Sequence, residues 1–154
     1  MQIRQVTENK KRYLALLLLG DEQESQIDRY LERGTLFVLD DDGVQAVCVV
    51  TDEGGGMLEV QNLAVVPDRQ RQGLGRTMLA FVERYAQGRW SALRVRTGDS
   101  PLTVPFYERC GFRRCGVVKD YFPQHYDHPI YEGGRLLIDQ ICMEKQLGQP
   151  LQTN

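Results

Sequence analysis

LEVQNLAVVPDRQRQGLGRTML, residues 58–79, is the stretch that decides the fold of this chain. It opens as an apolar strand, is interrupted at Pro67 and becomes charged before two glycines, Gly73 and Gly75. From Gly73 to Gly88 the spacing of apolar residues predicts an amphipathic helix that ends in glycine. The residues that share its apolar face are Leu74, Met78, Phe81, Val82 and Tyr85.

The two glycines admit two explanations, a ligand or the geometry of the connection alone. Backbone N–H groups at a helix start have no intrahelical partners and bind phosphate, and glycine lets a phosphate approach closely. The plain alternative is a tight strand-to-helix connection without a ligand. The stretch lacks the Lys-Ser/Thr of a P-loop and the G-x-G-x-x-G of a dinucleotide fold, which argues against both kinds of nucleotide site.

The remaining sequence predicts one α/β domain with a single mixed, mostly antiparallel sheet of about six to seven strands and about four helices. We expect this domain at 1–147 and a tail at 148–154. The expected helices are 8–19, a second one capped by Asp21 or Ser25 and stopped by Gly34, 73–88 and 102–110. The expected strands are 2–6, 35–39, 44–50, 57–66, 93–97, 112–119 and 136–144, with a hairpin turn at Asp40–Gly43.

Composition and charge exclude some classes of partner. The chain has 154 residues, of which 42% are hydrophobic and 26% charged, and its net charge is −2. This is enough chain for a core of its own, and no excess of positive charge is available to hold nucleic acid. The apolar run at 13–20 is too short to span a membrane and lacks a signal-peptide cleavage pattern, so we expect a cytoplasmic protein with no membrane partner.

The cysteines are interpreted as reduced thiols of a cytosolic protein. Two of them, Cys110 and Cys115, could be combined with His125 and His128 into a zinc site. Their spacing matches no strong zinc template, so we expect no metal. The four cysteines are Cys48, Cys110, Cys115 and Cys142.

Two segments resemble motifs of the GCN5-related N-acetyltransferases (GNAT family). The first is NLAV-x-P with the glycines of QRQGLG, at 62–75, and the second is PFYERCGF at 105–112, which resembles the family's F-Y-x-x-x-G-F motif. The two segments are separated by one predicted strand, as in the family, and the order of elements matches across nearly the whole chain. The resemblance implies a GNAT fold and an enzyme that transfers acetyl from acetyl-CoA to an amine.

The resemblance also implies where acetyl-CoA binds. The strand edge at Leu63, Ala64 and Val65 would pair with the pantetheine amides as an added strand does, because in the family this strand carries a bulge and splays from the next one. Asp99 stands where many members place an asparagine that bonds the pantetheine, although an ionised aspartate cannot donate. The pyrophosphate would be held by the backbone of Gln70, Arg71, Gln72, Gly73, Leu74, Gly75 and Arg76.

Tyr107 occupies the family's position for the general acid that protonates the departing thiolate. A phenol with a pKa near ~10 is protonated at neutral pH and can donate to sulfur, although the residue could also be a core tyrosine. For the base we expect Glu59, since in several relatives a carboxylate in this region takes the amine proton through water; it could instead be a solvated strand carboxylate. His125 and Asp127 are rivals for this role, because histidine titrates near neutral pH.

The acceptor is expected between the early helices and the loop at 121–134, called here the late loop. Its aromatic and acidic side chains suit a cation; they are Tyr121, Phe122, Tyr126, Tyr131, Asp120, Asp127 and Glu132. The amine itself, on a small molecule or a peptide, is not identified by the sequence. A CoA-binding sensor or assembly module without catalysis is an alternative, whereas the acidic balance argues against a toxin that acts on charged tRNA. Many family members are dimers, so the resemblance allows a homodimer.

Overall fold

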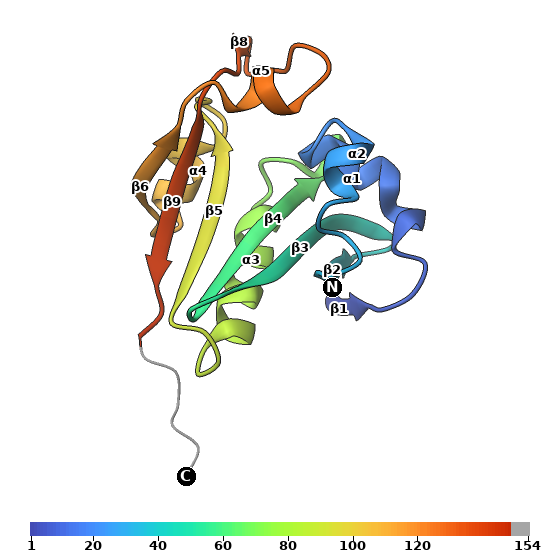
Figure 1. Ribbon diagram of the computed structural model, residues 1–154. Helices are drawn as coiled ribbons and strands as arrows, with labels where there is room; N and C mark the ends of the chain where they lie inside the picture. The colour runs from blue at the N-terminus through green and yellow to red at the C-terminus, as the bar shows by residue number, and fades with distance from the viewer. Residues whose placement is uncertain (149–154) are drawn as a thin grey trace.

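The computed structural model describes residues 1–148 (Figure 1), so the predicted tail at 148–154 lies outside the described part apart from Gly148. The strands are β1 Gln2–Val6, β2 Thr35–Asp40, β3 Val44–Gly54, β4 Met57–Val65, β5 Ala92–Gly98, β6 Arg113–Val118, β7 Tyr131–Glu132, β8 Arg135–Leu136 and β9 Gln140–Gln146. The helices are α1 Leu14–Gly20, α2 Glu24–Ile27, α3 Leu74–Ala86, α4 Val104–Arg109 and α5 Tyr121–His125, with 3₁₀ turns at Lys10–Tyr13 and Pro67–Arg69.

Seven strands form one sheet in the order β1-β2-β3-β4-β5-β9-β6, while β7 and β8 form a separate hairpin. Within this sheet the β4–β5 pair is parallel and the other pairs are antiparallel. The predicted mixed α/β fold is therefore confirmed. No helix within residues 1–148 is long and apolar enough to cross a membrane.

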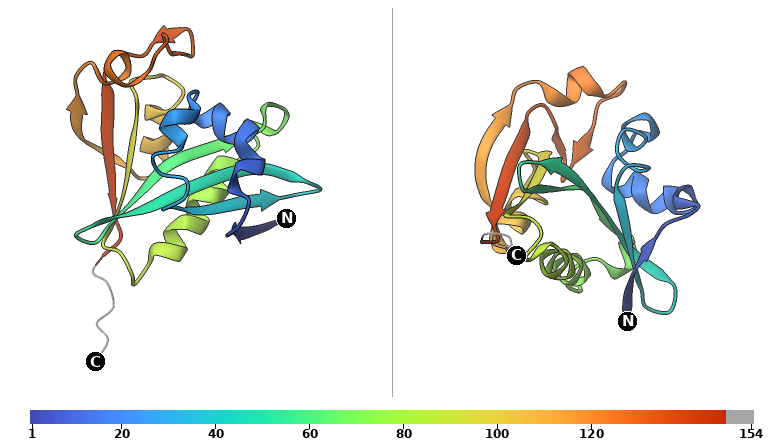
Figure 2. Two further views of the ribbon diagram at one scale, coloured as in Figure 1. Left: turned by 45° about the vertical axis from the view of Figure 1, so that its right-hand side comes forward. Right: turned by 60° about the horizontal axis from the view of Figure 1, so that its bottom comes forward.

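The sheet has a hydrophobic core on each face. Phe37 and Leu39 of β2 pack with α3 and α4, whereas Leu36 and Val38 of the same strand pack with residues of α1 and α2. This follows from the alternation of side chains along a strand. Figure 2 shows the blue early helices and the yellow-green α3 on opposite sides of the teal strands.

The early helices are shorter than the sequence predicts. A 3₁₀ turn precedes α1, and α2 ends at Ile27, after which the chain continues in turns. The buried Lys10 holds the turns that follow, because its ammonium donates to the carbonyl oxygens of Leu31 at 3.0 Å and Gly34 at 2.8 Å. Those carbonyls therefore need no helical partner. The predicted capping role of Asp21 or Ser25 is wrong, since Gln23 occupies the N-cap position of α2.

The late part of the chain contains more secondary structure than the predicted loop and single strand. The late loop contains α5 and β7, and the strand predicted at 136–144 is divided between β8 and β9. The cause is a small core of Phe122, Ile130 and Leu137. Leu137 N donates to Ile130 O at 2.8 Å and Phe122 N donates to Ile138 O at 3.0 Å, which holds residues 137–138 against the late loop rather than in the sheet.

Candidate functional site

Strands β4 and β5 lie side by side at one end only. Residues 57–60 pair in parallel register with residues 92–95, and the pairing stops there although β4 continues to Val65 and β5 to Gly98. Figure 1 shows the two strands diverging towards their carboxyl ends. The sheet therefore opens between two neighbouring strands, and backbone groups along the opening have no strand partner on that side.

A β-bulge at Gln61 accompanies this divergence. In the ladder with β3, Val49 pairs with Asn62 and Val50 with Val60, so Gln61 is an extra residue on β4. A bulge bends its strand and increases the local twist. The bulge and the splayed strands that the family resemblance implied are thus both observed in this chain.

Beyond the bulge, alternate residues of β4 direct their backbone groups into the opening. Val66 N donates to Gln45 O across the β3 side at 2.9 Å. Because backbone direction alternates along a strand, Ala64 also faces β3, while Leu63 and Val65 face the opening. Val65 O accepts a hydrogen bond from Gln70 Nε2 at 3.0 Å, which fixes the following loop against the strand.

The glycine loop, residues 70–76, ends in the start of α3. Arg71 and Gly73 have left-handed backbones, with φ of 64° and 83°. Thr77 N donates to Gly73 O at 2.9 Å, so the N–H groups of residues 74–76 precede the first helical bond and have no acceptor within the helix. Arg71 and Arg76 are exposed and add positive charge to the dipole of the helix end. The loop has the properties of an anion-binding site.

The two glycines have different structural reasons. A Cβ on Gly73 would have no atom within 4 Å, so its backbone angle, not crowding within the protein, requires glycine. A Cβ on Gly75 would lie 3.3 Å from the ring of Phe106, so this glycine lets α3 pack closely on α4. The space next to Gly73 is therefore open to a ligand, and Gly75 positions the helix.

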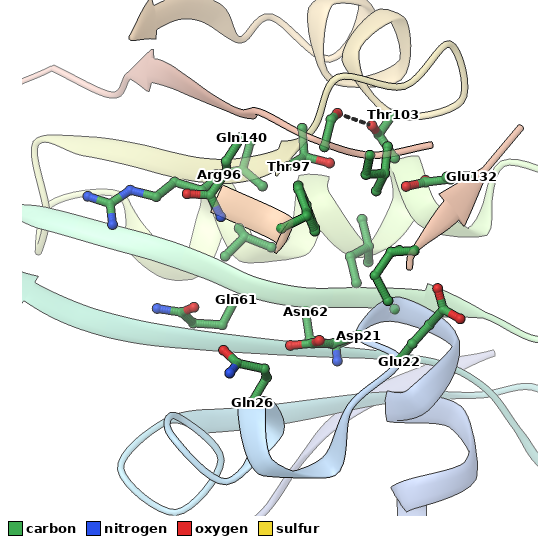
Figure 3. Close-up of a pocket in the computed structure, with 18 of the residues that line it drawn as sticks. Asp21, Glu22, Gln26, Gln61, Asn62, Arg96, Thr97, Thr103, Glu132 and Gln140 are labelled. Carbon is green, nitrogen blue, oxygen red and sulfur yellow. Dashed lines mark hydrogen bonds between the residues drawn. The ribbon is translucent and has the colours of Figure 1, made fainter. Parts of the chain in front are cut away.

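A cavity of about 660 Å³ lies at the opening of the sheet (Figure 3). The early helices, β4, β5, α4 and the late loop all contribute to its walls. Nine of the residues predicted for the site or its acceptor region are brought together here: Glu59, Leu63, Gln70, Tyr107, Tyr121, Phe122, Tyr126, Tyr131 and Glu132.

Tyr107 reaches the cavity from α4 and is 6% exposed. Edge-on contacts with Phe106 and Phe112, at centroid distances of 5.1 and 5.5 Å, hold its ring. Burial raises the pKa of Tyr107, with smaller contributions from nearby acidic groups. The phenol is therefore a proton donor throughout the neutral range.

Glu59 is 4% exposed, so the interpretation as a solvated strand carboxylate is wrong. Its carboxylate contacts the guanidinium of Arg94, and Arg96 Nε lies 3.8 Å away. Arg94 also lies 4.0 Å from Glu53, which in turn accepts a hydrogen bond from Arg33 at 2.9 Å. Glu59 thus lines the cavity as one member of a chain of alternating charges.

Asp21 joins the two sides of the cavity, a role that the sequence did not reveal. Its carboxylate accepts hydrogen bonds from the hydroxyls of Tyr30 at 3.0 Å and Tyr126 at 2.6 Å. Tyr30 in turn accepts from Asn62 Nδ2 at 3.1 Å, so β4, the early helices and the late loop meet in one network. Burial raises the pKa of Asp21, while the two tyrosine hydroxyls oppose that rise.

The cavity carries opposite charges at its two ends. Figure 3 shows Glu22 and Glu132 at one end, and Arg96 with Gln61 at the other. Burial, and after it the charge of Glu22, raises the pKa of Glu132. Two buried side-chain oxygens within residues 1–148 have no hydrogen-bond donor, and both belong to lining residues, Asn62 and Gln140. The cavity therefore offers negative charge and free acceptors to a ligand that donates hydrogen bonds.

Several predicted residues do not line this cavity, namely Ala64, Val65, residues 71–76, Asp99, Asp120, His125 and Asp127. Asp99 lies in a smaller depression, 3.6 Å from Arg135. His125 stacks on Tyr121, and its Nδ1 lies 2.8 Å from the carbonyl oxygen of Tyr121. The side chain of Asp127 is 80% exposed and lies 2.7 Å from His128. No sequence signal distinguished these positions from Asp21, Asn62, Arg96 and Gln140, which do line it.

The parallel strand pair opens beside a helix start that can bind an anion, and the buried Tyr107 lines the cavity at this opening. Comparison with known proteins identifies the family. Residues 32–114 match the model of the acetyltransferase (GNAT) domain. The chain is 31% identical over 129 residues to the uncharacterised N-acetyltransferase YvbK of Bacillus subtilis. The matched segment covers 82% of this chain and 83% of YvbK. The chain belongs to the GNAT family and is an acetyl-CoA-dependent N-acetyltransferase.

Solved structures agree with this assignment. An IAA acetyltransferase from Bacillus cereus superposes with a TM-score of 0.88 at 33% identity and covers 95% of this chain and 99% of its own. A GNAT family acetyltransferase from Elizabethkingia anophelis with acetyl-CoA bound superposes with a TM-score of 0.89 at 29% identity, covering 95% and 97%. The fold and family that the sequence predicted are confirmed.

Proposed function

We propose that the enzyme transfers acetyl directly from acetyl-CoA to a primary amine bound in the 660 Å³ cavity. The observation that carries the proposal is the opening between β4 and β5, which begins after Val60 and Val95. Tyr107 and Glu59 both line the cavity at this opening. Both reactants can therefore meet there without a covalent enzyme intermediate.

Acetyl-CoA is proposed to bind along the glycine loop and β4. The N–H groups of residues 74–76 and the exposed Arg71 and Arg76 suit the pyrophosphate. The backbone groups of Leu63 and Val65 face the opening and suit the pantetheine amides. The backbone groups of Ala64 face β3 instead, so Ala64 is not assigned a hydrogen bond to the cofactor. Asp99, half-exposed beside Arg135, lies outside the cavity and is not assigned a contact.

Two side chains are proposed to move the protons. Acetyl-CoA supplies a thioester whose sulfur leaves as a thiolate. Tyr107 donates its hydroxyl proton to that sulfur, and its raised pKa keeps the proton available. Glu59 receives the proton lost by the amine through an intervening water, and Arg94 fixes the position of its carboxylate. His125 and Asp127 lie outside the cavity and are not included.

The acceptor is proposed to be a cationic amine, carried by a small molecule or a peptide. Asp21, Glu22 and Glu132 supply negative charge on one side of the cavity, and Tyr121 and Tyr126 supply aromatic faces. The unpaired oxygen of Gln140 can accept a hydrogen bond from the amine N–H. An acceptor with a second positive charge would satisfy more of these groups than a neutral amine.

An amine panel tests this proposal by thiol release from acetyl-CoA. It includes a primary diamine, a peptide with a free N-terminus, a neutral alkylamine and an α-amino acid. We expect the diamine or the peptide to give the highest kcat/KM, and Glu132→Gln to lower it. Asp127→Ala is the matched control, because Asp127 is exposed and lies outside the cavity. Preference for neutral amines, or equal effects of both variants, would refute the cationic acceptor. Failure of every amine would favour a CoA sensor.

A further inference from the structure

We propose that Cys115 and Cys142 form a redox-active dithiol that closes to a disulfide when the protein meets hydrogen peroxide. The two side chains lie on adjacent strands, β6 and β9, outside the acetyl-transfer cavity. Cys115 Sγ donates a hydrogen bond to Cys142 Sγ at 3.0 Å. Both thiols are free, Cys115 is exposed and Cys142 is half-buried, so a small oxidant can reach the pair.

A second β-bulge brings the sulfurs together. Between β6 and β9, Arg114 pairs with Met143 and Gly116 pairs with Cys142, so Cys115 is an extra residue on the edge strand. At a bulge two residues oppose one, which turns the side chain of Cys115 onto the same face as that of Cys142. Gly116 leaves space there, since a Cβ on it would lie 3.8 Å from Cys142 Cβ. The two sulfurs are 3.0 Å apart, so a movement of about 1 Å brings them to the ~2.05 Å of a disulfide bond.

The same atoms could be considered a metal site, because Cys115, Cys142 and Glu144 have ligand atoms within 4.8 Å of one another. Two sulfurs bound to zinc at ~2.3 Å in tetrahedral geometry lie ~3.8 Å apart. The observed sulfurs are closer and joined by a hydrogen bond, which favours the disulfide. This group is the one set of three candidate ligands found within residues 1–148, and it includes neither Cys110 nor the two histidines considered from the sequence.

The surroundings of the two thiols indicate the order of reaction. Cys115 is the hydrogen-bond donor of the pair, so its proton faces the Cys142 sulfur, and that sulfur is placed to react as the nucleophile. Partial loss of water contact beside Cys142, together with the hydrogen bond to that residue, raises the pKa of Cys115. Cys142 is therefore the thiol that is oxidised first, and Cys115 is the one that resolves the product.

The reaction balances with peroxide as the oxidant. The Cys142 thiolate attacks the O–O bond, gains an S–OH group and releases hydroxide. That hydroxide takes the proton of Cys115 and becomes water. The Cys115 sulfur then attacks the Cys142 sulfur, the S–O bond breaks, and a second hydroxide leaves. Two thiol groups have lost two electrons to peroxide, and one disulfide has formed.

Peroxide treatment of the full chain, followed by alkylation and peptide mapping, tests this site. We expect a linked Cys115–Cys142 peptide that a dithiol reductant separates. In Cys115→Ser, Cys142 should accumulate sulfenic and sulfinic acid instead, because the resolving thiol is absent. Cys110→Ser is the matched control and should still form the link, since Cys110 lies on another element.

Two results would overturn the inference. One is alkylation of Cys115 and Cys142 in the treated protein to the same extent as in the untreated protein. The other is stoichiometric Zn²⁺ binding that blocks oxidation and disappears in Cys115→Ser, which would make the cluster a metal site. Circular dichroism of each variant establishes that the fold is kept, so a missing link cannot be attributed to unfolding.

Discussion

The hydroxyl of Tyr126 donates a hydrogen bond of 2.6 Å to the carboxylate of Asp21. This bond joins two residues that are 105 positions apart in the chain. Two further hydrogen bonds connect the same segments: Gln26 Nε2 donates to His125 O at 2.8 Å, and Asp127 N donates to Gln23 Oε1 at 2.9 Å. The late loop is therefore fixed to the early helices across the cavity, and the acceptor must bind within this frame.

Tyr126→Phe should loosen this connection without altering the cofactor region. Loss of one hydrogen bond to a carboxylate should lower the free energy of unfolding by about 1.5–3 kcal/mol. We expect a higher KM for the acceptor, faster hydrogen exchange in residues 121–126 and an unchanged Kd for acetyl-CoA. Tyr85→Phe, on the opposite face of the sheet and outside the cavity lining, is the control. Equal exchange rates in Tyr126→Phe and the wild type would argue against the connection.

Tyr107→Phe should separate catalysis from binding. The variant keeps the ring and its packing on Phe106 and Phe112 but lacks the proton donor. Positioned acids contribute ~10²–10⁴-fold to rate, and since water can substitute we expect kcat to fall at least about tenfold. Calorimetry should give an unchanged Kd for acetyl-CoA. An undiminished kcat, measured where chemistry limits turnover, would leave Tyr107 with a packing role only.

Glu59→Gln should impair proton removal from the amine. The amide keeps the size of the side chain but cannot accept the proton, so kcat/KM should fall roughly 10–100-fold. Glu53→Gln is a matched control, because Glu53 also lines the cavity and contacts Arg94 from the other side. We expect Glu53→Gln to change kcat/KM by less than about threefold, within the effect of a weak exposed ion pair. If the two variants behave alike, Glu59 acts by holding Arg94 rather than as a base.

Gly73→Ala should weaken acetyl-CoA binding at the glycine loop. The new Cβ meets no protein atom within 4 Å, so it would occupy space assigned to the ligand, at a residue with φ of 83°. We expect the Kd to rise at least about tenfold, which is about 1.4 kcal/mol. Gly55→Ala is the control for backbone strain, since Gly55 has φ of 61° and equally open surroundings in the β3–β4 turn. Unaltered affinity in Gly73→Ala, by calorimetry, would move the pyrophosphate elsewhere.

Asp21 should lower the free energy of unfolding as pH rises, whereas an ordinary ion-paired carboxylate raises it. Its pKa in the folded protein is raised above the usual 3.8, so its contribution to stability is full below that value and is lost as pH rises through the folded pKa. The free energy of unfolding of the wild type, relative to Asp21→Asn, should therefore fall as pH rises above 3.8. Denaturant titrations at several pH values measure this difference.

Asp139 provides the control of opposite sign. The backbone N–H of Asp120 lowers the pKa of Asp139, so the contribution of this group is present above the unfolded pKa and is lost as pH falls. Relative to Asp139→Asn, the stability of the wild type should rise with pH on the acid side of the usual pKa of 3.8, whereas the Asp21 difference falls with pH above that value. The same slope for both pairs would show that burial does not govern the titration of Asp21.

The sequence by itself determined the local elements of the cofactor half. Local patterns predicted the strand at 57–66, the glycine loop and the helix after Gly73. Apolar spacing and glycine could predict them because both act within a few residues along the chain. The PFYERCGF segment was equally local, and together the two motifs identified the family. The bounds of β4 and α3 differ from the prediction by one to two residues.

Only the tertiary structure decided the acceptor half. Asp21 received its tyrosine partners, and Glu59 its arginines, from elements distant in sequence, and no spacing rule links position 21 to position 126. The ammonium of Lys10 binds the carbonyls of Leu31 and Gly34, a contact that the apolar periodicity of the early helices does not indicate. Burial and charge pairing depend on the assembled fold. The side chains that line this cavity could therefore be identified only from the tertiary structure, in which β4, β5, the early helices and the late loop lie together.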